Sequence, residues 1–132
     1  MKKLIIAVDF DGTLVEDKWP EIGEAILPAL ALVKQWRDTG HSLILWTCRH
    51  GKELADAVGY LHTNFGITFD KVNENIDETV EKYGCNPRKI TADIYFDDRS
   101  AKDWREALYK AIDEEGELPL LWQKKECLEG RR

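Results

Sequence analysis

Two aspartates, separated by one residue, follow a short apolar run. Asp9 and Asp11 come directly after residues 4–8, and in an extended chain the side chains at i and i+2 point to the same side. An aspartate can attack phosphorus to form an aspartyl-phosphate. A second carboxyl group can protonate the leaving oxygen and then activate the water that hydrolyses this intermediate. The spacing therefore predicts that Asp9 is a nucleophile and Asp11 its acid–base partner.

A second acidic pair, Asp97 and Asp98, follows another apolar run at 94–96. Carboxylates gathered at one centre repel each other unless a cation is present or their pKa values rise. Mg²⁺ suits such a centre, because it prefers oxygen ligands and usually keeps waters and substrate phosphate oxygens. We therefore predict a Mg²⁺ site formed by Asp9, Asp11, Asp97 and Asp98.

Three further residues have chemistry that suits a phosphate. Gly12 allows a sharp turn after the first strand. Thr47 offers a hydroxyl and a backbone N–H at the start of a turn that leads into a helix. Lys89 is a compact cation that can stabilise a phosphoryl group. Gly12, Thr47 and Lys89 are the predicted phosphate-binding residues. Arg49, His50 and Trp19 are candidate substrate contacts, and a structural salt bridge remains an equal alternative for Arg49 and for Arg99.

Strand and helix patterns alternate along the chain. Strands are expected at 4–8, 43–46, 67–72 and 94–96, and the first of these runs is apolar without polar alternation. Helices are expected after Pro28, over 54–65, over 77–83 and over 104–112. The pattern predicts right-handed crossovers and an α/β fold, a three-layer α/β/α sandwich around a Rossmann-like parallel sheet.

The carboxyl ends of the three strongest strands carry Asp9, Thr47 and Asp97. Ligands of open α/β sheets bind outside these ends, so the sequence predicts one crevice that gathers the polar residues. A hairpin turn would explain an isolated Asp-Gly pair, but it would not explain polar residues at the ends of separate strands.

Composition limits the class of protein. The 132 residues fit one domain over 1–132, with a tail at about 117–132. No apolar stretch is long enough to span a membrane. The net charge of −6 argues against a broad nucleic-acid footprint. The three cysteines have no metal-type spacing, which predicts reduced thiols and a cytoplasmic location.

The motifs resemble those of the haloacid dehalogenase (HAD) superfamily. Residues 9–14, Asp-Phe-Asp-Gly-Thr-Leu, resemble its first motif and 45–47, Leu-Trp-Thr, its second, while Lys89 and Asp97-Asp98 resemble the third and fourth. The resemblance implies that Asp9 is nucleophile and metal ligand, and that Asp11 is the acid–base residue whose carbonyl also binds metal. An aspartate in that second position implies a phosphatase or phosphomutase rather than a dehalogenase.

The spacing between motifs leaves no room for the cap domain that many members insert, only for the family's short hairpin flap, at about 12–24. The resemblance therefore implies an open, capless enzyme acting on a phosphorylated substrate, with a small molecule favoured. It leaves a homo-oligomer open, since a neighbouring subunit can act as a lid. Two alternatives also remain open. One is a phosphotransferase that excludes water, and the other is a phosphorylatable regulatory or binding module without turnover.

Overall fold

A computed structural model describes residues 3–97 of the chain. Nine elements follow in order: β1 (Ile5–Val8), β2 (Val15–Lys18), β3 (Glu21–Ala25), α1 (Leu27–Asp38), β4 (Ser42–Leu45), α2 (Gly51–Phe65), β5 (Lys71–Val72), α3 (Asp77–Tyr83) and β6 (Ile94–Phe96). The predictions for Asp98, Arg99, the helix over 104–112 and the tail at about 117–132 lie outside the described residues.

The central sheet has four parallel strands in the order β5-β4-β1-β6. The last residue of β1, Val8, lies in register with Leu45 of β4 and with Phe96 of β6. Because these three strands end level, the residues that follow them emerge at one edge of the sheet. The prediction of an α/β fold with a parallel sheet is confirmed, and the arrangement is compatible with a Rossmann-like fold.

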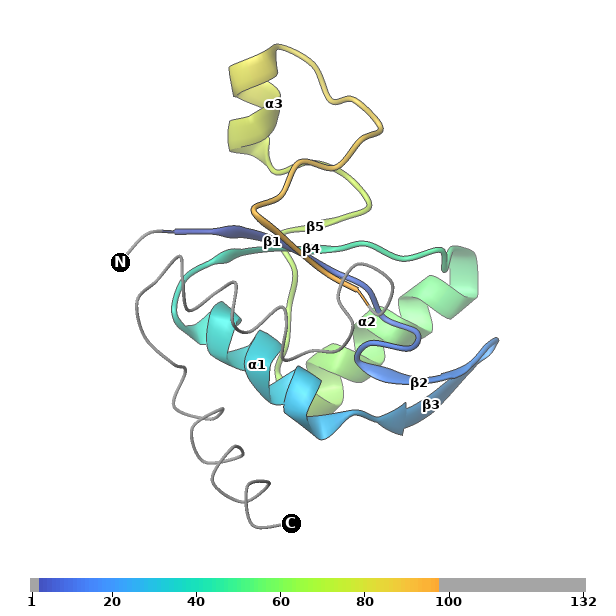
Figure 1. The fold of residues 1–132 in the computed structure, drawn as a ribbon. Helices are drawn as coiled ribbons and strands as arrows, with labels where there is room; N and C mark the ends of the chain where they lie inside the picture. Colours follow the sequence, from blue (N-terminus) through green and yellow to red (C-terminus); the bar gives the residue numbers. More distant parts are fainter. Residues whose placement is uncertain (1–2, 98–132) are drawn as a thin grey trace.

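The two faces of the sheet are covered by different parts of the chain. Ile6 and Val8 belong to a core cluster that they share with α1 and α2. The alternate residues, Ala7 and Ile44, pack with Ile76 and Ile90 on either side of α3 in the sequence. In Figure 1, α1 and α2 lie below the sheet and α3 lies above it. Burial on both faces explains why β1 and β4 read as continuous apolar runs.

The predicted helices over 54–65 and 77–83 and the helix after Pro28 are confirmed. Pro28 lies in the first turn of α1, where a missing N–H costs little. Gly66 caps α2 in the left-handed conformation, with φ of 65°.

The strand expected at 67–72 is wrong in its first part, since β5 contains only Lys71 and Val72. Ile67 donates its backbone N–H to the Leu61 carbonyl and is buried in the core. Its backbone therefore closes the end of α2 instead of pairing with β4.

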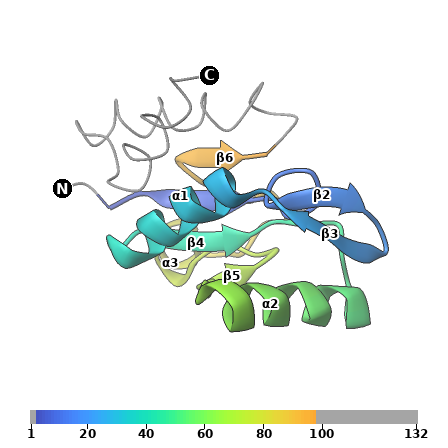
Figure 2. The ribbon, with the colours of Figure 1, turned by 90° about the horizontal axis from the view of Figure 1, so that it is seen from below.

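Strands β2 and β3 form a hairpin, which we call the flap, in the region where the resemblance implied one. Gly12 has a φ of 86°, which lets the chain turn from β1 into the flap. A Cβ at Gly23 would overlap the Glu16 carbonyl oxygen, so glycine is needed where the two strands approach most closely. Figure 2 shows that the flap stands at the end toward which the strands of the sheet point.

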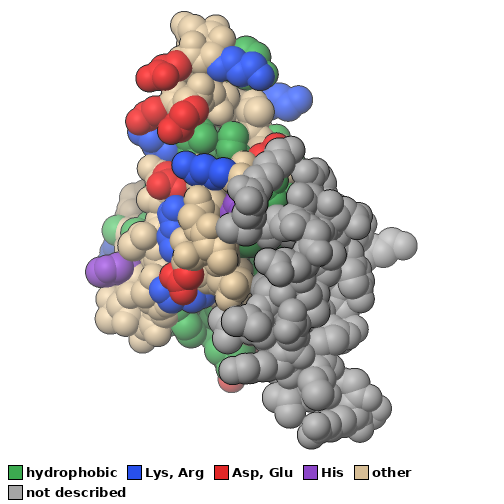
Figure 3. Space-filling view, turned by 90° about the vertical axis from the view of Figure 1, so that its left-hand side faces the viewer, with side chains coloured by type: hydrophobic (Ala, Val, Ile, Leu, Met, Phe, Trp, Pro, Cys, Tyr) green, Lys and Arg blue, Asp and Glu red, His purple; other side chains and the backbone are tan. Residues whose placement is uncertain are grey.

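Charges of both signs are mixed on the surface of the described residues. In Figure 3 acidic and basic side chains lie side by side over α3 and the neighbouring loop, so the described part of this face has no patch of a single sign. None of the helices within residues 3–97 is long and apolar enough to cross a membrane.

Candidate active site

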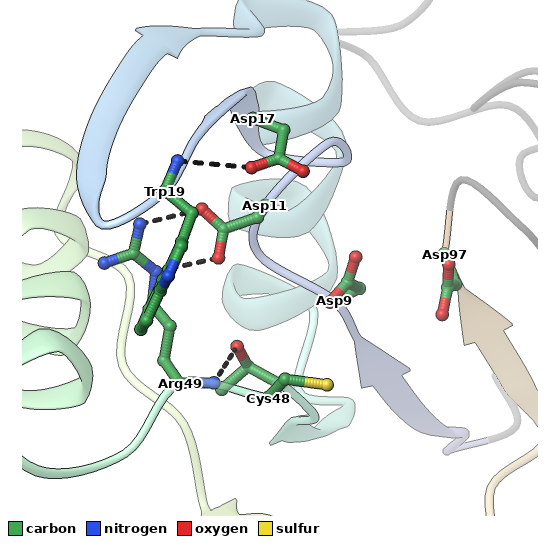
Figure 4. A pocket seen from close by; sticks show the side chains of 8 residues that line it. Asp9, Asp11, Asp17, Trp19, Cys48, Arg49 and Asp97 are labelled. Atoms are coloured by element: carbon green, nitrogen blue, oxygen red, sulfur yellow. Dashed lines mark hydrogen bonds and ion pairs between the residues drawn. The ribbon is translucent and has the colours of Figure 1, made fainter.

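A pocket of about 400 Å³ opens at the carboxyl edge of the sheet, beside the flap. Eight residues from the ends of β1, β4 and β6 and from the flap line it: Asp9, Asp11, Asp17, Trp19, Thr47, Cys48, Arg49 and Asp97. The structure thus brings together six of the residues that the sequence singled out. Figure 4 shows Asp9 beside Asp97, with Asp11 and Arg49 farther toward the flap.

Asp9 is held firmly at the end of β1. Its backbone N–H donates to the Phe96 carbonyl at 3.0 Å, which extends the pairing of β1 with β6 by one residue. Its Oδ2 accepts a hydrogen bond from the hydroxyl of Thr13 at 3.3 Å, and Thr13 is buried. Backbone and side chain are therefore both oriented before any substrate arrives, as a nucleophile requires.

Thr47 is positioned by a residue that the sequence analysis did not single out, Asn73. The Asn73 side chain accepts a hydrogen bond from the Thr47 N–H at 2.8 Å and donates one to the Thr47 carbonyl at 2.9 Å. The Thr47 hydroxyl oxygen accepts a bond from the Arg49 N–H at 3.1 Å, which leaves the hydroxyl hydrogen to point elsewhere. Asn73 thus fixes the backbone from which the Thr47 hydroxyl reaches the pocket.

Replacing Asn73 by Ala is expected to destabilise the protein by about 1–2 kcal/mol, because two hydrogen bonds are lost. Asn73 also has a φ of 55°, which Ala tolerates poorly. If Thr47 binds phosphate, KM should rise several-fold. Urea unfolding and steady-state kinetics check both effects. Asn64→Ala, which removes one surface bond to the Tyr60 carbonyl on α2, is the matched control. Equal results for the two variants would contradict the role of Asn73.

Asp11 forms a two-bond ion pair with Arg49. The Arg49 Nε and Nη2 atoms donate to Oδ2 and Oδ1 of Asp11, each at 2.8 Å. The Arg49 side chain is 1% exposed and that of Asp11 18%. Hydrogen bonding to Asp11 raises the pKa of Arg49, although burial opposes the shift. Of the two alternatives for Arg49, the geometry therefore favours the structural salt bridge, with a guanidinium that stays charged at any ordinary pH.

Three predicted residues do not line the pocket. Lys89 is exposed in the loop between α3 and β6, and its carbonyl accepts a hydrogen bond from the buried Asn75 side chain. His50 is exposed just before α2, where its side chain makes no capping bond. Gly12 supplies the turn beside the pocket rather than a lining atom. Lys89 and His50 stay predictions without support from this arrangement.

Three residues of the site were missed. Asp17 lines the pocket from the flap, and its carboxylate accepts the Trp19 N–H at 3.3 Å. Cys48 lines it beside Thr47, with an exposed thiol. Asn73 directly follows β5, so the rule that selected Asp9 and Asp97, a polar residue at the end of a strand, would also have selected it. Asp17 carries no comparable signal, because its place depends on how the flap folds.

The carboxylates in the pocket fit a Mg²⁺ ion that is coordinated partly by the protein and partly by a substrate phosphate. Within residues 3–97, no group of three or more His, Cys, Asp or Glu side chains is arranged so that it could hold a metal ion. Mg²⁺ is commonly bound through only one or two carboxylates, with waters and substrate phosphate filling its other positions. Asp9 and Asp97, from neighbouring strands, supply those two carboxylates.

Fold and pocket together define an α/β protein with an acidic site at the carboxyl edge of a parallel sheet. No protein-family model matches the chain, and no curated protein does. The chain is 35% identical to a conserved protein coded by a locus of Bacteroides thetaiotaomicron, whose solved structure superposes with a TM-score of 0.71. The match covers 88% of this chain and 93% of the other. The chain therefore belongs to the same family as that protein.

Proposed function

We propose that the protein is a Mg²⁺-dependent phosphomonoester hydrolase of the HAD type, acting through an aspartyl-phosphate on Asp9. One observation carries the proposal: Asp9, Asp11, Thr47 and Asp97, which come from the ends of three strands, line one pocket. We further propose that the fold is a three-layer α/β/α sandwich without a cap. Packing of 76–90 on the face opposite α1 and α2 supports this reading.

The reaction has two halves. A carboxylate oxygen of Asp9 attacks phosphorus, and the bond from phosphorus to the leaving oxygen breaks, with its electron pair going to that oxygen. Asp11 supplies the proton that turns the leaving group into an alcohol. Asp11 then takes a proton from water as the water attacks the same phosphorus, which releases inorganic phosphate and regenerates Asp9. Asp9 and Asp97 would hold Mg²⁺, which would supply positive charge between the carboxylate and the phosphate.

Lone pairs of the Asp11 carboxylate remain for this proton exchange although Arg49 binds both of its oxygens. A carboxylate offers about four lone-pair sites, and the guanidinium uses two of them. Thr47 donates its hydroxyl to a phosphate oxygen in this scheme. Lys89 would have to reach the pocket from its loop to play the role that the resemblance implies.

A phosphotransferase and a phosphorylatable module use the same groups and remain the alternatives. The acidic lining and the pocket volume of about 400 Å³ favour a small phosphorylated molecule over nucleic acid. We place the protein in the cytoplasm, since Cys48 and Cys85 are exposed free thiols. A homo-oligomer stays compatible with an open site.

A panel of phosphorylated metabolites assayed with Mg²⁺ and with excess EDTA tests the proposal. We expect release of inorganic phosphate from at least one small phosphomonoester, and a loss of at least about 10²-fold when the metal is removed. Transfer of phosphate to an added alcohol in place of release would favour the phosphotransferase. A stable phosphoprotein without release would favour the regulatory module.

A further inference from the structure

Every hydrogen-bond donor of the buried Arg49 guanidinium is occupied. Its five N–H groups make five bonds: two to the Asp11 carboxylate, one each to the carbonyls of Pro20 and Glu21 at 3.1 and 2.9 Å, and one to the Glu53 carbonyl at 3.3 Å. Arg49 is 2% exposed. It therefore has no donor left for a substrate phosphate.

These partners belong to separate parts of the site. Asp11 follows β1, Pro20 and Glu21 form the tip of the flap, and Glu53 lies in the first turn of α2. The guanidinium carbon also lies 5.0 Å from the centre of the Phe10 ring and 5.1 Å from that of Trp19 at the flap tip. Rings at this range attract a cation. Figure 4 shows the Arg49 guanidinium against the Trp19 ring, with its two bonds to the Asp11 carboxylate.

Two roles compete for such a residue. As a ligand of the substrate, Arg49 would leave donors turned toward the pocket, but all of its donors face protein acceptors. As a positioning residue, it would fix the orientation of the Asp11 carboxylate, because two parallel hydrogen bonds define the relative orientation of the guanidinium and carboxylate planes. The same guanidinium holds two carbonyls of the flap tip, so movement of the flap would disturb the Asp11 carboxylate.

We propose that Arg49 is a positioning residue that ties the orientation of the Asp11 carboxylate to the position of the flap tip. This rests on the proposed function, in which Asp11 protonates the leaving oxygen. The flap then does more than line the pocket, because its position also orients the acid–base residue. For a substrate that needs no proton on its leaving group, formation of the phosphoenzyme should not depend on Arg49.

Arg49→Lys tests the coupling while keeping the charge. A lysine ammonium has three donors and lacks the planar fork, so it cannot hold both Asp11 oxygens and the flap tip together. The matched control is Arg37→Lys, because Arg37 also bonds one carboxylate and two backbone carbonyls but lies away from the pocket. Arg49→Gln serves as a second variant if Lys supports the network.

The kinetic readout compares two substrates in the presence of Mg²⁺. 4-Nitrophenyl phosphate releases a stable anion, whereas an alkyl phosphate found active in the metabolite panel needs a proton on its leaving oxygen. Rapid-quench measurements isolate formation of the phosphoenzyme, the half-reaction in which the leaving group departs. We expect Arg49→Lys to lower the rate of this step for the alkyl ester by about tenfold or more, and to change it for 4-nitrophenyl phosphate by less than about threefold. Arg37→Lys should leave the ratio of the two rates unchanged.

A second readout does not depend on activity. Hydrogen–deuterium exchange of the peptide over 14–26 should be about tenfold faster in Arg49→Lys than in the wild type, since bonds to the flap tip are lost. Equal exchange in the two proteins, with Arg49→Gln also unchanged, would overturn the tie between Arg49 and the flap.

The outcomes separate this inference from the proposed function. An equal loss in phosphoenzyme formation from both esters, with a raised KM, would overturn it in favour of phosphate binding by Arg49. Faster flap exchange with unchanged rates would overturn the positioning role. If the wild type hydrolyses no phosphomonoester, the proposed function fails and the positioning role fails with it, while exchange still decides whether Arg49 holds the flap.

Discussion

Asp9→Asn is expected to reduce Mg²⁺-dependent phosphate release by roughly 10⁴-fold or more, to the level of the assay blank. An amide nitrogen carries no charge and an amide oxygen is a poor nucleophile, so no aspartyl-phosphate can form. Asn is close to Asp in size. Its side-chain oxygen can still accept the hydrogen bond that Thr13 donates to Asp9, so the fold should survive.

The control for this variant is Asp56→Asn on the exposed side of α2. Asp56 makes an ion pair with Lys52 at 2.7 Å, four residues before it on the same helix. Such a surface pair contributes little to stability, and it lies outside the pocket lining. Asp56→Asn should therefore match the wild type in rate. Retention of most of the activity in Asp9→Asn would refute Asp9 as the nucleophile.

Asp11→Asn is expected to slow both halves of the reaction by about 10²–10⁴-fold, because the leaving oxygen and the attacking water both lose their proton partner. It should also destabilise the protein by about 1–3 kcal/mol. An Asn side chain offers one acceptor where Asp offers two, and the buried Arg49 charge loses its counter-ion. Rapid-quench kinetics and urea unfolding measure the two effects separately.

The acid–base role predicts more than a slow enzyme. The loss in the first half-reaction should be larger for an alkyl phosphate than for 4-nitrophenyl phosphate, while the loss in dephosphorylation should be the same for both, since both give the same phosphoenzyme. Unchanged kinetics across several pH values would refute the role. An equal loss for both substrates in the first half-reaction would point to structural damage alone.

The sequence predicted the frame of the site because the frame depends on local signals. The runs at 4–8 and 43–46 are apolar throughout, and such runs form central parallel strands. Once the strands are parallel and level, Asp9, Thr47 and Asp97 must come to one edge. A hairpin follows β1, in the region where the resemblance implied a flap, although the polar stretch itself indicated only turns.

The interior of the site could not be predicted in the same way. Arg49 and Asp11 lie 38 residues apart in the sequence, and their pairing depends on how the turn after β4 meets the turn after β1. The sequence alone does not show whether an arginine near a phosphate site binds the substrate or another residue of the protein. For Lys89 the sequence did suggest a role, because it lies eight residues before Asp97 and could bind phosphate. In the structure Lys89 is not among the residues that line the pocket.

Asn73 lies between these cases. It follows β5, so its place at the edge of the sheet could have been predicted, but that strand is only two residues long. The start of β5 could not be predicted from the apolar residues at 67–72, because Ile67 is buried in the core without being part of a strand. A buried residue outside a strand is apolar in the same way as a residue of a buried strand, so the sequence does not distinguish the two.

The most direct test of Asp9 as nucleophile is to trap the phosphoenzyme. The wild-type protein, mixed with Mg²⁺ and an active phosphomonoester and quenched in acid within milliseconds, is digested with trypsin and analysed by mass spectrometry. We predict one added phosphate on the peptide over 4–18, carried by Asp9 and absent from Asp9→Asn. Phosphate release with no phosphopeptide at any quench time, or a phosphate on another peptide, would contradict the account.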